Sequence, residues 1–219
     1  MEFTREIYWN VGHGVGTLLP MYLLTFAALA ALINEGIRRV RVYRQGRPLN
    51  RHDQFSTRCA GALKGLLLQT KVVRVKGPGL AHALFFWGFS LLFIGTCLIL
   101  LQADITDPLF DVRFLTGPFY LLFSLVLDLS GLMAILMLVG LLVRRYLVRP
   151  GSLDSKIDDV IAHGLLLAIL VGGFVIEGSR MAVTELGTPL AAWSPVGLLV
   201  AKALAPLGEE ALLSLHSYN

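Results

Sequence analysis

Residues 76–102 read KGPGLAHALFFWGFSLLFIGTCLILLQ, and this stretch decides the class of fold. Its apolar part runs without a charged side chain from Gly79 to Leu101. A bilayer span needs about 20 such residues. The apolar residues are continuous and do not alternate with a period of two, which favours a helix over a strand. Because only helices and closed barrels satisfy the backbone inside a bilayer, the stretch predicts a transmembrane helix.

Three further runs have the same character, and the composition agrees with them. We predict an all-α integral membrane bundle with four transmembrane helices, over about residues 11–35, 79–101, 117–143 and 159–183. The chain of 219 residues is 55% hydrophobic and 16% charged. Soluble domains are about 45–50% apolar and about 25% charged. The whole chain is therefore expected to form one membrane domain.

The basic side chains lie between the apolar runs. Of the 19 Lys and Arg residues, eleven fall in the segment 36–78 and four in the segment 144–158. Loops rich in Lys and Arg stay on the cytoplasmic side of a membrane. We therefore predict that both segments are cytoplasmic and that the N-terminus lies outside, in the cytoplasmic membrane of a bacterium or archaeon. This topology accounts for the net charge of +4, and we predict no nucleic-acid partner.

The basic segment 36–78 also contains a helical pattern. The positions at helical spacing are Phe55, Cys59, Leu63, Leu66, Leu67 and Thr70. They predict an amphipathic helix on the inner membrane surface, which binds either anionic lipid or a soluble partner. The tail 194–219 is interrupted by Pro195 and Pro206, so we expect short interfacial helices there.

Two histidines stand at matched positions in separate predicted spans. His82 and His163 each lie about one turn inside the cytoplasmic end of their helix, roughly 5–6 Å below the boundary. Imidazoles from two helices can ligate the iron of a b-type haem from opposite faces. Gly79 and Gly164 lie beside them, and small residues let a flat macrocycle approach the backbone. The alternative is that each histidine forms a hydrogen bond between helices.

His13 and His216 are candidates for a second haem near the outer face. His13 opens the first run among glycines, and His216 lies close to the end of the chain. Each is also compatible with an ordinary interfacial histidine. The two cysteines, Cys59 and Cys97, form neither a CxxC pair nor a metal-ligand spacing, so the chain cannot build an iron–sulfur cluster of its own.

Three ionisable residues lie within the predicted spans, where charges are costly and often functional. Asp128 is near the middle of the third span, and it either binds a quinone or a proton, or forms a hydrogen bond to a neighbouring helix. Glu177 and Arg180 are three residues apart in the fourth span, which allows a local ion pair. Alternatively, Arg180 holds a haem propionate and Glu177 exchanges protons with a quinone.

Four segments together resemble a known family of membrane proteins. They are REIYWNVGH at 5–13, GLAHALFFWGFSLLFIGT at 79–96, FYLLFSLVLDLSGL at 119–132 and GFVIEGSRMA at 173–182. In this order they are similar to the membrane cytochrome b domain of the nitrate reductase gamma subunit and of the heterodisulfide reductase membrane subunit. The resemblance is strongest to heterodisulfide-reductase-like iron–sulfur oxidoreductases.

This resemblance implies a dihaem cytochrome b domain that exchanges electrons with a membrane quinone, menaquinone in particular. It also implies a cytoplasmic iron–sulfur protein or domain as partner, and an electron-transfer flavoprotein is a further candidate. Members of the family usually continue with another span and iron–sulfur modules, so we expect this chain to be part of a larger system.

The sequence therefore predicts an electron-transfer component of a quinone oxidoreductase, with haem b as its cofactor. Two alternatives stay open. The chain could be a membrane anchor without haem, whose histidines only pack. A small transporter is the other alternative, but it requires charges around a midplane site, and only Asp128 lies centrally.

Overall fold

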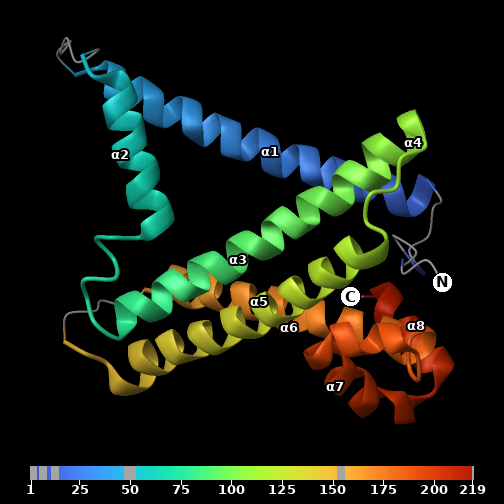
Figure 1. Ribbon diagram of the computed structural model, residues 1–219. Helices are drawn as coiled ribbons and strands as arrows, with labels where there is room; N and C mark the ends of the chain where they lie inside the picture. Colours follow the sequence, from blue (N-terminus) through green and yellow to red (C-terminus); the bar gives the residue numbers. More distant parts are fainter. Residues whose placement is uncertain (1–3, 5–8, 11–14, 47–52, 152–155, 219) are drawn as a thin grey trace. The chain divides into compact units, whose positions relative to one another are not determined.

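The computed structural model describes residues 4, 9–10, 15–46, 53–151 and 156–218, and none of these residues forms a strand. The helices are α1 (Val15–Arg44), α2 (Phe55–Leu68), α3 (Pro78–Leu100), α4 (Asp107–Phe110), α5 (Gly117–Leu142), α6 (Ile157–Thr184), α7 (Pro195–Leu204) and α8 (Glu209–Tyr218). Figure 1 shows them in chain order from blue to red. The prediction of an all-α fold is confirmed.

Four of the described helical segments are long and apolar enough to cross a membrane, as a multi-pass membrane protein requires. They are Leu18–Arg44, Pro78–Phe110, Gly117–Val148 and Ile157–Thr184. The prediction of four long apolar helices is therefore confirmed, and the start of the first predicted span, residues 11–14, lies outside the described residues. The helix α1 continues past Glu35 because its basic end residues are good helix formers, and Glu35 accepts a hydrogen bond from Arg39 at 3.3 Å.

The chain divides into two compact units, residues 10–68 and residues 1–9 with 69–219. The first unit contains α1 and α2, whose described side chains are almost all exposed. The predicted amphipathic helix is present as α2, and it ends at Leu68. The second unit contains α3 to α8 and holds every residue of the site described below.

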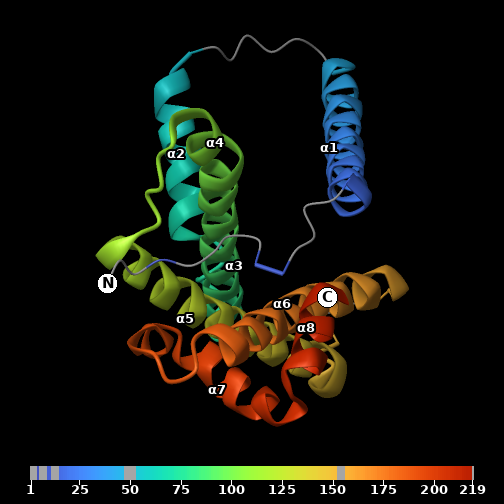
Figure 2. The same cartoon turned by 90° about the vertical axis from the view of Figure 1, so that its right-hand side faces the viewer.

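In the second unit, α3 crosses α5, and α6 packs against α5 (Figures 1 and 2). The crossing of α3 and α5 is close because Gly88 has no side chain. A Cβ atom there would lie 2.8 Å from the carbonyl oxygen of Ser130 and 3.2 Å from the Cβ of Ala134. Small residues allow such backbone approach between membrane helices, where packing rather than the hydrophobic effect drives association.

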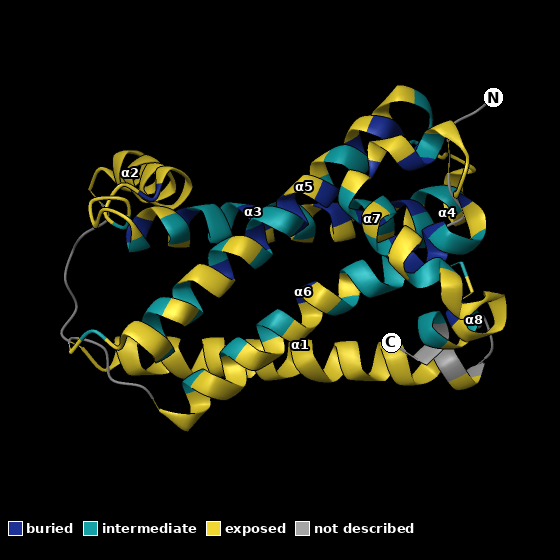
Figure 3. Ribbon diagram, turned by 90° about the horizontal axis from the view of Figure 1, so that it is seen from below, coloured by how far each residue is buried: buried dark blue, intermediate teal, exposed yellow. Residues whose placement is uncertain are grey.

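The buried residues form small clusters between these helices, whereas the outer faces are apolar and exposed (Figure 3). One cluster joins α5 to the turn before it through Leu115, Tyr120 and Phe123. A second includes Ala134 of α5 and Leu170 of α6. Exposed apolar faces of this extent fit helices that are surrounded by lipid.

The C-terminal tail forms short helices, as expected. Both α7 and α8 pack against α6 (Figure 2). Met181 of α6 is fully buried in a cluster with Ala191 and Ala201. The tail therefore completes the end of the bundle at which α6 finishes.

Two π-helical segments, which the sequence did not predict, extend the long helices. The segment Leu101–Thr106 follows α3, and Val143–Val148 follows α5. In the first, the side-chain oxygen of the buried Gln102 accepts a hydrogen bond from the backbone N–H of Leu115 at 2.6 Å. Such segments often occur at functional sites, and the second one contributes to the site below.

Candidate functional site

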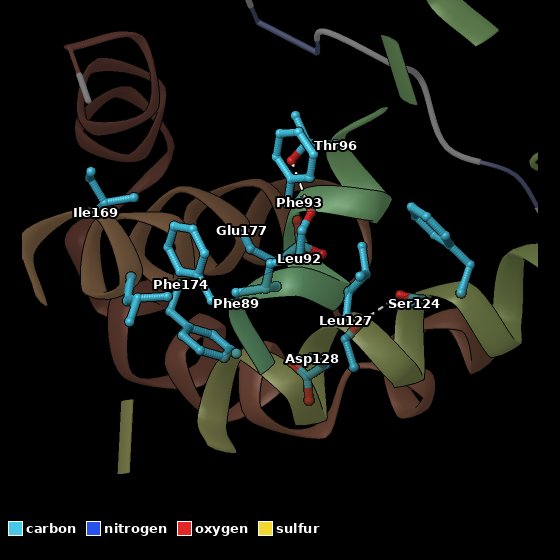
Figure 4. Close-up of a pocket in the computed structure, with 15 residues that line it drawn as sticks. Phe89, Leu92, Phe93, Thr96, Ser124, Leu127, Asp128, Ile169, Phe174 and Glu177 are labelled. Carbon is cyan, nitrogen blue, oxygen red and sulfur yellow. Dashed lines mark hydrogen bonds between the residues drawn. The ribbon is translucent and has the colours of Figure 1, made fainter. Parts of the chain in front are cut away.

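A cavity of about 390 Å³ lies between α3, α5 and α6 (Figure 4). Its lining residues are Phe89, Leu92, Phe93, Thr96, Phe123, Ser124, Leu127, Asp128, Gly131, Ile169, Leu170, Gly173, Phe174, Glu177 and Ser194. Most of these side chains are apolar or aromatic, and two are carboxylates, one each from α5 and α6. A mostly apolar pocket with a few convergent polar groups is the usual form of a small-molecule site.

Asp128 lies in the wall of this cavity and also fixes the start of α7. Its carboxylate accepts hydrogen bonds from the backbone N–H groups of Val196 and Gly197, both at 2.8 Å. These N–H groups belong to the first turn of α7, which has no partner for them within the helix. The hydroxyls of Ser124 and Ser194 are hydrogen-bonded at 2.7 Å beside them. Of the two interpretations of Asp128, the structure therefore contains the hydrogen bond to a neighbouring helix.

The glycine at position 197 is required by this contact. A Cβ atom there would lie 2.8 Å from the sulfur of Met181 and 3.4 Å from a carboxylate oxygen of Asp128. A larger residue would push the turn away from α6 and lengthen the hydrogen bond to Asp128. The chain therefore uses a small residue to seat α7 against both α5 and α6.

Glu177, Arg180 and Glu185 form a chain of ion pairs at the end of α6. Arg180 donates from Nε and from one terminal nitrogen to the two oxygens of Glu177, at 3.2 and 2.8 Å. Its other terminal nitrogen donates to Glu185, which lies just after α6. Arg180 and Glu185 are only 7% and 5% exposed. The predicted pair of Glu177 and Arg180 is present, and Glu185 is an addition that the sequence analysis missed.

His216 of α8 lies near these groups. Its ring packs edge-on against Trp9, with ring centroids 4.8 Å apart. Its Nδ1 atom is buried and has no hydrogen-bond partner among the described residues. Burial lowers the pKa of His216, the positive charge of Arg180 lowers it further, and Glu177 opposes both effects. His216 is therefore held mainly in its neutral form at neutral pH, with an imidazole nitrogen facing the interior.

His163 lies at the other end of α6 and is oriented by Tyr146. The Tyr146 hydroxyl lies 3.0 Å from Nδ1 of His163, and the two rings meet edge-on. Tyr146 belongs to the π-helical segment Val143–Val148, and Arg145 in the same segment donates to Asp159 of α6 at 2.6 Å. The contact with Tyr146 orients the His163 ring, and the ion pair holds the π-helical segment against the start of α6.

The remaining residues that the sequence predicted as haem-binding are not joined to His163 or to the cavity by a hydrogen bond or ion pair in the part of the chain that the structure describes. His82 is exposed in the second turn of α3. Gly79 has a packing role, because a Cβ atom there would overlap the carbonyl of Val72, whereas a Cβ at Gly164 would meet no atom within 4 Å. His13 lies outside the described residues. Among the described residues, no group of three or more His, Cys, Asp or Glu side chains is placed to hold a metal ion.

Tyr146 and Glu185 are the two site residues that sequence reasoning did not identify. Tyr146 carries no signal by itself, because its contact with His163 depends on the π-helical geometry that follows α5. For Glu185 the sequence gives only a weak indication of an ion pair, namely a carboxylate five residues after Arg180 in a segment with few charges. Its contact requires the chain to turn at the end of α6, where the backbone N–H of Glu185 donates to the carbonyl of Met181.

Comparison with known proteins gives one informative relationship. The chain is 31% identical over 176 residues to the EtfAB:quinone oxidoreductase of Syntrophomonas wolfei, and the match covers 77% of this chain and 24% of that protein. The chain thus spans about a quarter of the length of the curated relative. No protein-family model and no solved structure matches the chain. The relationship indicates a protein related to quinone oxidoreductases, and the narrower resemblance to membrane cytochromes b stays a prediction.

Proposed function

We propose that this chain is the membrane domain of a quinone oxidoreductase and that it binds a quinone in the cavity between α3, α5 and α6. The observation that carries the proposal is the pairing of an apolar cavity with two carboxylates, Asp128 and Glu177, in a helical unit of membrane type. The name of the distant relative supports the same class of substrate.

The cavity suits the chemistry of a quinone. Phe89, Phe93 and Phe174 offer aromatic faces for the flat ring, and the apolar wall suits a prenyl tail. The quinone oxygens need hydrogen-bond donors and, on reduction, protons. Glu177 lies on the cavity wall with its side chain 25% exposed, and when protonated it can donate to a quinone oxygen. Asp128, Ser124 and Thr96 are held by uncharged partners within the protein, so we assign them to shaping the cavity.

We propose haem b as the electron carrier, with His82 and His163 as its axial ligands. Haem, when bound, passes single electrons between a donor and the quinone. The hydrogen bond between Tyr146 and Nδ1 of His163 leaves Nε2 as the ligating atom and fixes the ring, which is the usual arrangement of a ligating histidine. The open space beside Gly164 is compatible with a nearby macrocycle. His13 stays a candidate ligand of a second haem, whereas we assign His216, which packs against Trp9, to the protein interior and not to haem.

The partners follow from the same proposal. The name of the relative points to an electron-transfer flavoprotein as the electron donor. A cytoplasmic iron–sulfur protein or domain is expected to stand between donor and haem. The basic segments 36–78 and 144–158 are assigned to the cytoplasmic side, where they face that partner. Menaquinone is the proposed quinone, and the N-terminus lies outside.

Quinone binding is tested with a pair of neighbouring glycines. Gly173 lines the cavity and Gly172 does not, and a Cβ added at either meets no atom within 4 Å. Gly173→Leu therefore fills the cavity, whereas Gly172→Leu is its matched control. We expect menadione, measured by equilibrium dialysis against the purified protein in nanodiscs, to bind Gly173→Leu at least about tenfold more weakly, a loss of about 1.4 kcal/mol. Equal binding by both variants would contradict the proposal.

Haem binding is tested by spectroscopy. We expect the purified protein to show the reduced-minus-oxidised absorption of a b-type haem and to lose it in His163→Ala. Substitution of the exposed Tyr43 by Phe serves as the control. Protein that lacks this absorption after expression with added haem precursor would favour the membrane anchor without haem.

A further inference from the structure

The charges around Arg180 do not cancel, because one cation contacts two anions. Arg180 contacts two carboxylates, those of Glu177 and Glu185, so the three side chains carry a formal charge of −1 when all are ionised. Two of the three residues are almost completely buried. Burying a net charge is expensive unless it is compensated, and one carboxylate would have been enough to neutralise the guanidinium. The second carboxylate therefore calls for an explanation.

A single added proton neutralises this group of side chains. Three sites around Arg180 can hold it: the carboxylates of Glu177 and Glu185 and the imidazole of His216. The Nδ1 atom of His216 is buried without a hydrogen-bond partner among the described residues. An imidazole in that state can accept or donate a proton without first breaking a contact at Nδ1.

The residues around Arg180 extend from the cavity wall to the end of α6. Glu177 is part of the cavity wall, and its side chain is 25% exposed. Glu185 lies beyond the end of α6, and His216 lies on α8, outside the membrane-length helices. The other charged group that faces Glu177 is Asp128 of α5, which is held by the start of α7. Arg180 therefore joins a carboxylate on the cavity wall to one at the end of the bundle.

We propose that Glu177, Glu185 and His216, arranged around Arg180, form a proton-transfer site that serves the quinone cavity. The inference rests on the proposed function. For each quinone reduced, two electrons arrive from the reduced flavoprotein partner, and two protons join the quinone oxygens. The O–H bond of protonated Glu177 breaks as the quinol O–H bond forms. Glu177 then regains its proton from Glu185 or His216, so both protons pass through it in succession.

The roles of the residues differ. Glu177 is the group that contacts the substrate. Arg180 is a positioning residue, because it holds both carboxylates and takes no proton. Glu185 and His216 are the groups that reload Glu177, and their loss should slow proton transfer without changing how the quinone is bound.

The test uses the full chain in nanodiscs with menadione bound and reduced at an electrode. Infrared difference spectra report protonated carboxyl groups, and a pH-indicator dye reports proton uptake. We expect Glu185→Gln to remove part of the carboxyl signal and to slow proton uptake on the order of 10²-fold, as for loss of a general acid. We expect His216→Gln to slow uptake by a smaller factor. Glu209→Gln, at an exposed position on α8, is the matched control.

The outcomes separate this inference from the function on which it rests. If wild-type protein does not bind menadione, the proposed function and the inference both fall. If menadione binds and both variants keep the wild-type carboxyl signal and uptake rate, the inference alone is overturned. Should Glu185→Gln fail to fold, Glu185→Asp keeps the charge and moves the carboxyl. A carboxyl signal of unchanged frequency in Glu185→Asp, together with a wild-type uptake rate in His216→Gln, would overturn the inference, and a shifted signal or slowed uptake would support it.

Discussion

The two ends of α6 use polar side chains differently. At the cavity end, Asp128, Glu177 and Arg180 are each held by two or more hydrogen bonds from the protein itself. At the other end, which we call the histidine end, the Nδ1 atom of His163 is hydrogen-bonded to Tyr146, and His82 of α3 is exposed. Protein contacts by themselves therefore hold the polar side chains of the cavity end in place. The following predictions test this difference.

The largest effect is expected from removing the cation of the cavity end. Arg180→Gln leaves the buried Glu185 and the partly exposed Glu177 without their cation, and loss of one member of a buried ion pair costs about 3–5 kcal/mol. Arg113→Gln breaks an ion pair with Asp107 whose arginine side chain is 67% exposed, and it should cost at most about 1 kcal/mol. Thermal unfolding in detergent measures both. Similar melting temperatures for the two variants would contradict the comparison.

A smaller loss is expected when α7 loses its anchor. Asp128→Ala removes the acceptor for two backbone N–H groups, and we expect a loss of about 2–3 kcal/mol. Asp128→Asn keeps one acceptor oxygen and should fall between alanine and wild type. Limited proteolysis of the tail, together with thermal unfolding, measures the effect. Asp158→Ala, at an exposed position in the first turn of α6, is the control and should cost less than about 1 kcal/mol.

At the histidine end, the hydroxyl of Tyr146 should matter more for binding than for folding. Tyr146→Phe removes one hydrogen bond, which costs about 1 kcal/mol of stability. Loss of such an outer contact weakens binding of a ligated metal about 10–100-fold. Titration of the purified protein with haem, followed by absorption, measures the second effect, which rests on the proposed haem ligation. If the variant unfolds at a much lower temperature and binds haem as the wild type does, the histidine end is structural.

The smallest effect is a dependence of stability on pH. The folded protein lowers the pKa of His216, so the unfolded chain binds a proton more readily. Stability is therefore unaffected above the unfolded pKa of about 6.5 and declines as the pH falls from there towards the lower folded value. Melting temperatures of wild type and His216→Gln across this range measure it. The variant should show a flatter curve, and identical curves would contradict a buried neutral imidazole.

Much of the fold could be predicted from the sequence, for a physical reason. Apolar runs of sufficient length have one stable form in a bilayer, so α3, α5 and α6 follow from composition alone. The pair of Glu177 and Arg180 follows from helical spacing, since residues three apart lie on one face. The helix α1 continues beyond its predicted end to Arg44, because the basic residues that follow the apolar run are good helix formers.

The contacts that complete the site could not be predicted in the same way. The hydrogen bonds from Val196 and Gly197 to Asp128 join residues 68 and 69 positions apart in the chain. The contact between Tyr146 and His163 depends on a π-helical turn, and the one between Arg180 and Glu185 on the way the chain leaves α6. Such contacts are set by tertiary packing, and no local pattern encodes them.

The anchoring of α7 by Asp128 also sets an order of events during biosynthesis. When α5 enters the membrane, the segment that will satisfy its carboxyl group has not yet left the ribosome, because it lies 68 residues downstream. Until Val196 emerges, the nascent chain carries an unsatisfied acid among lipids or at the insertion machinery. Only when α7 has been made can the carboxyl group of Asp128 gain the two backbone donors that hold it in the folded chain.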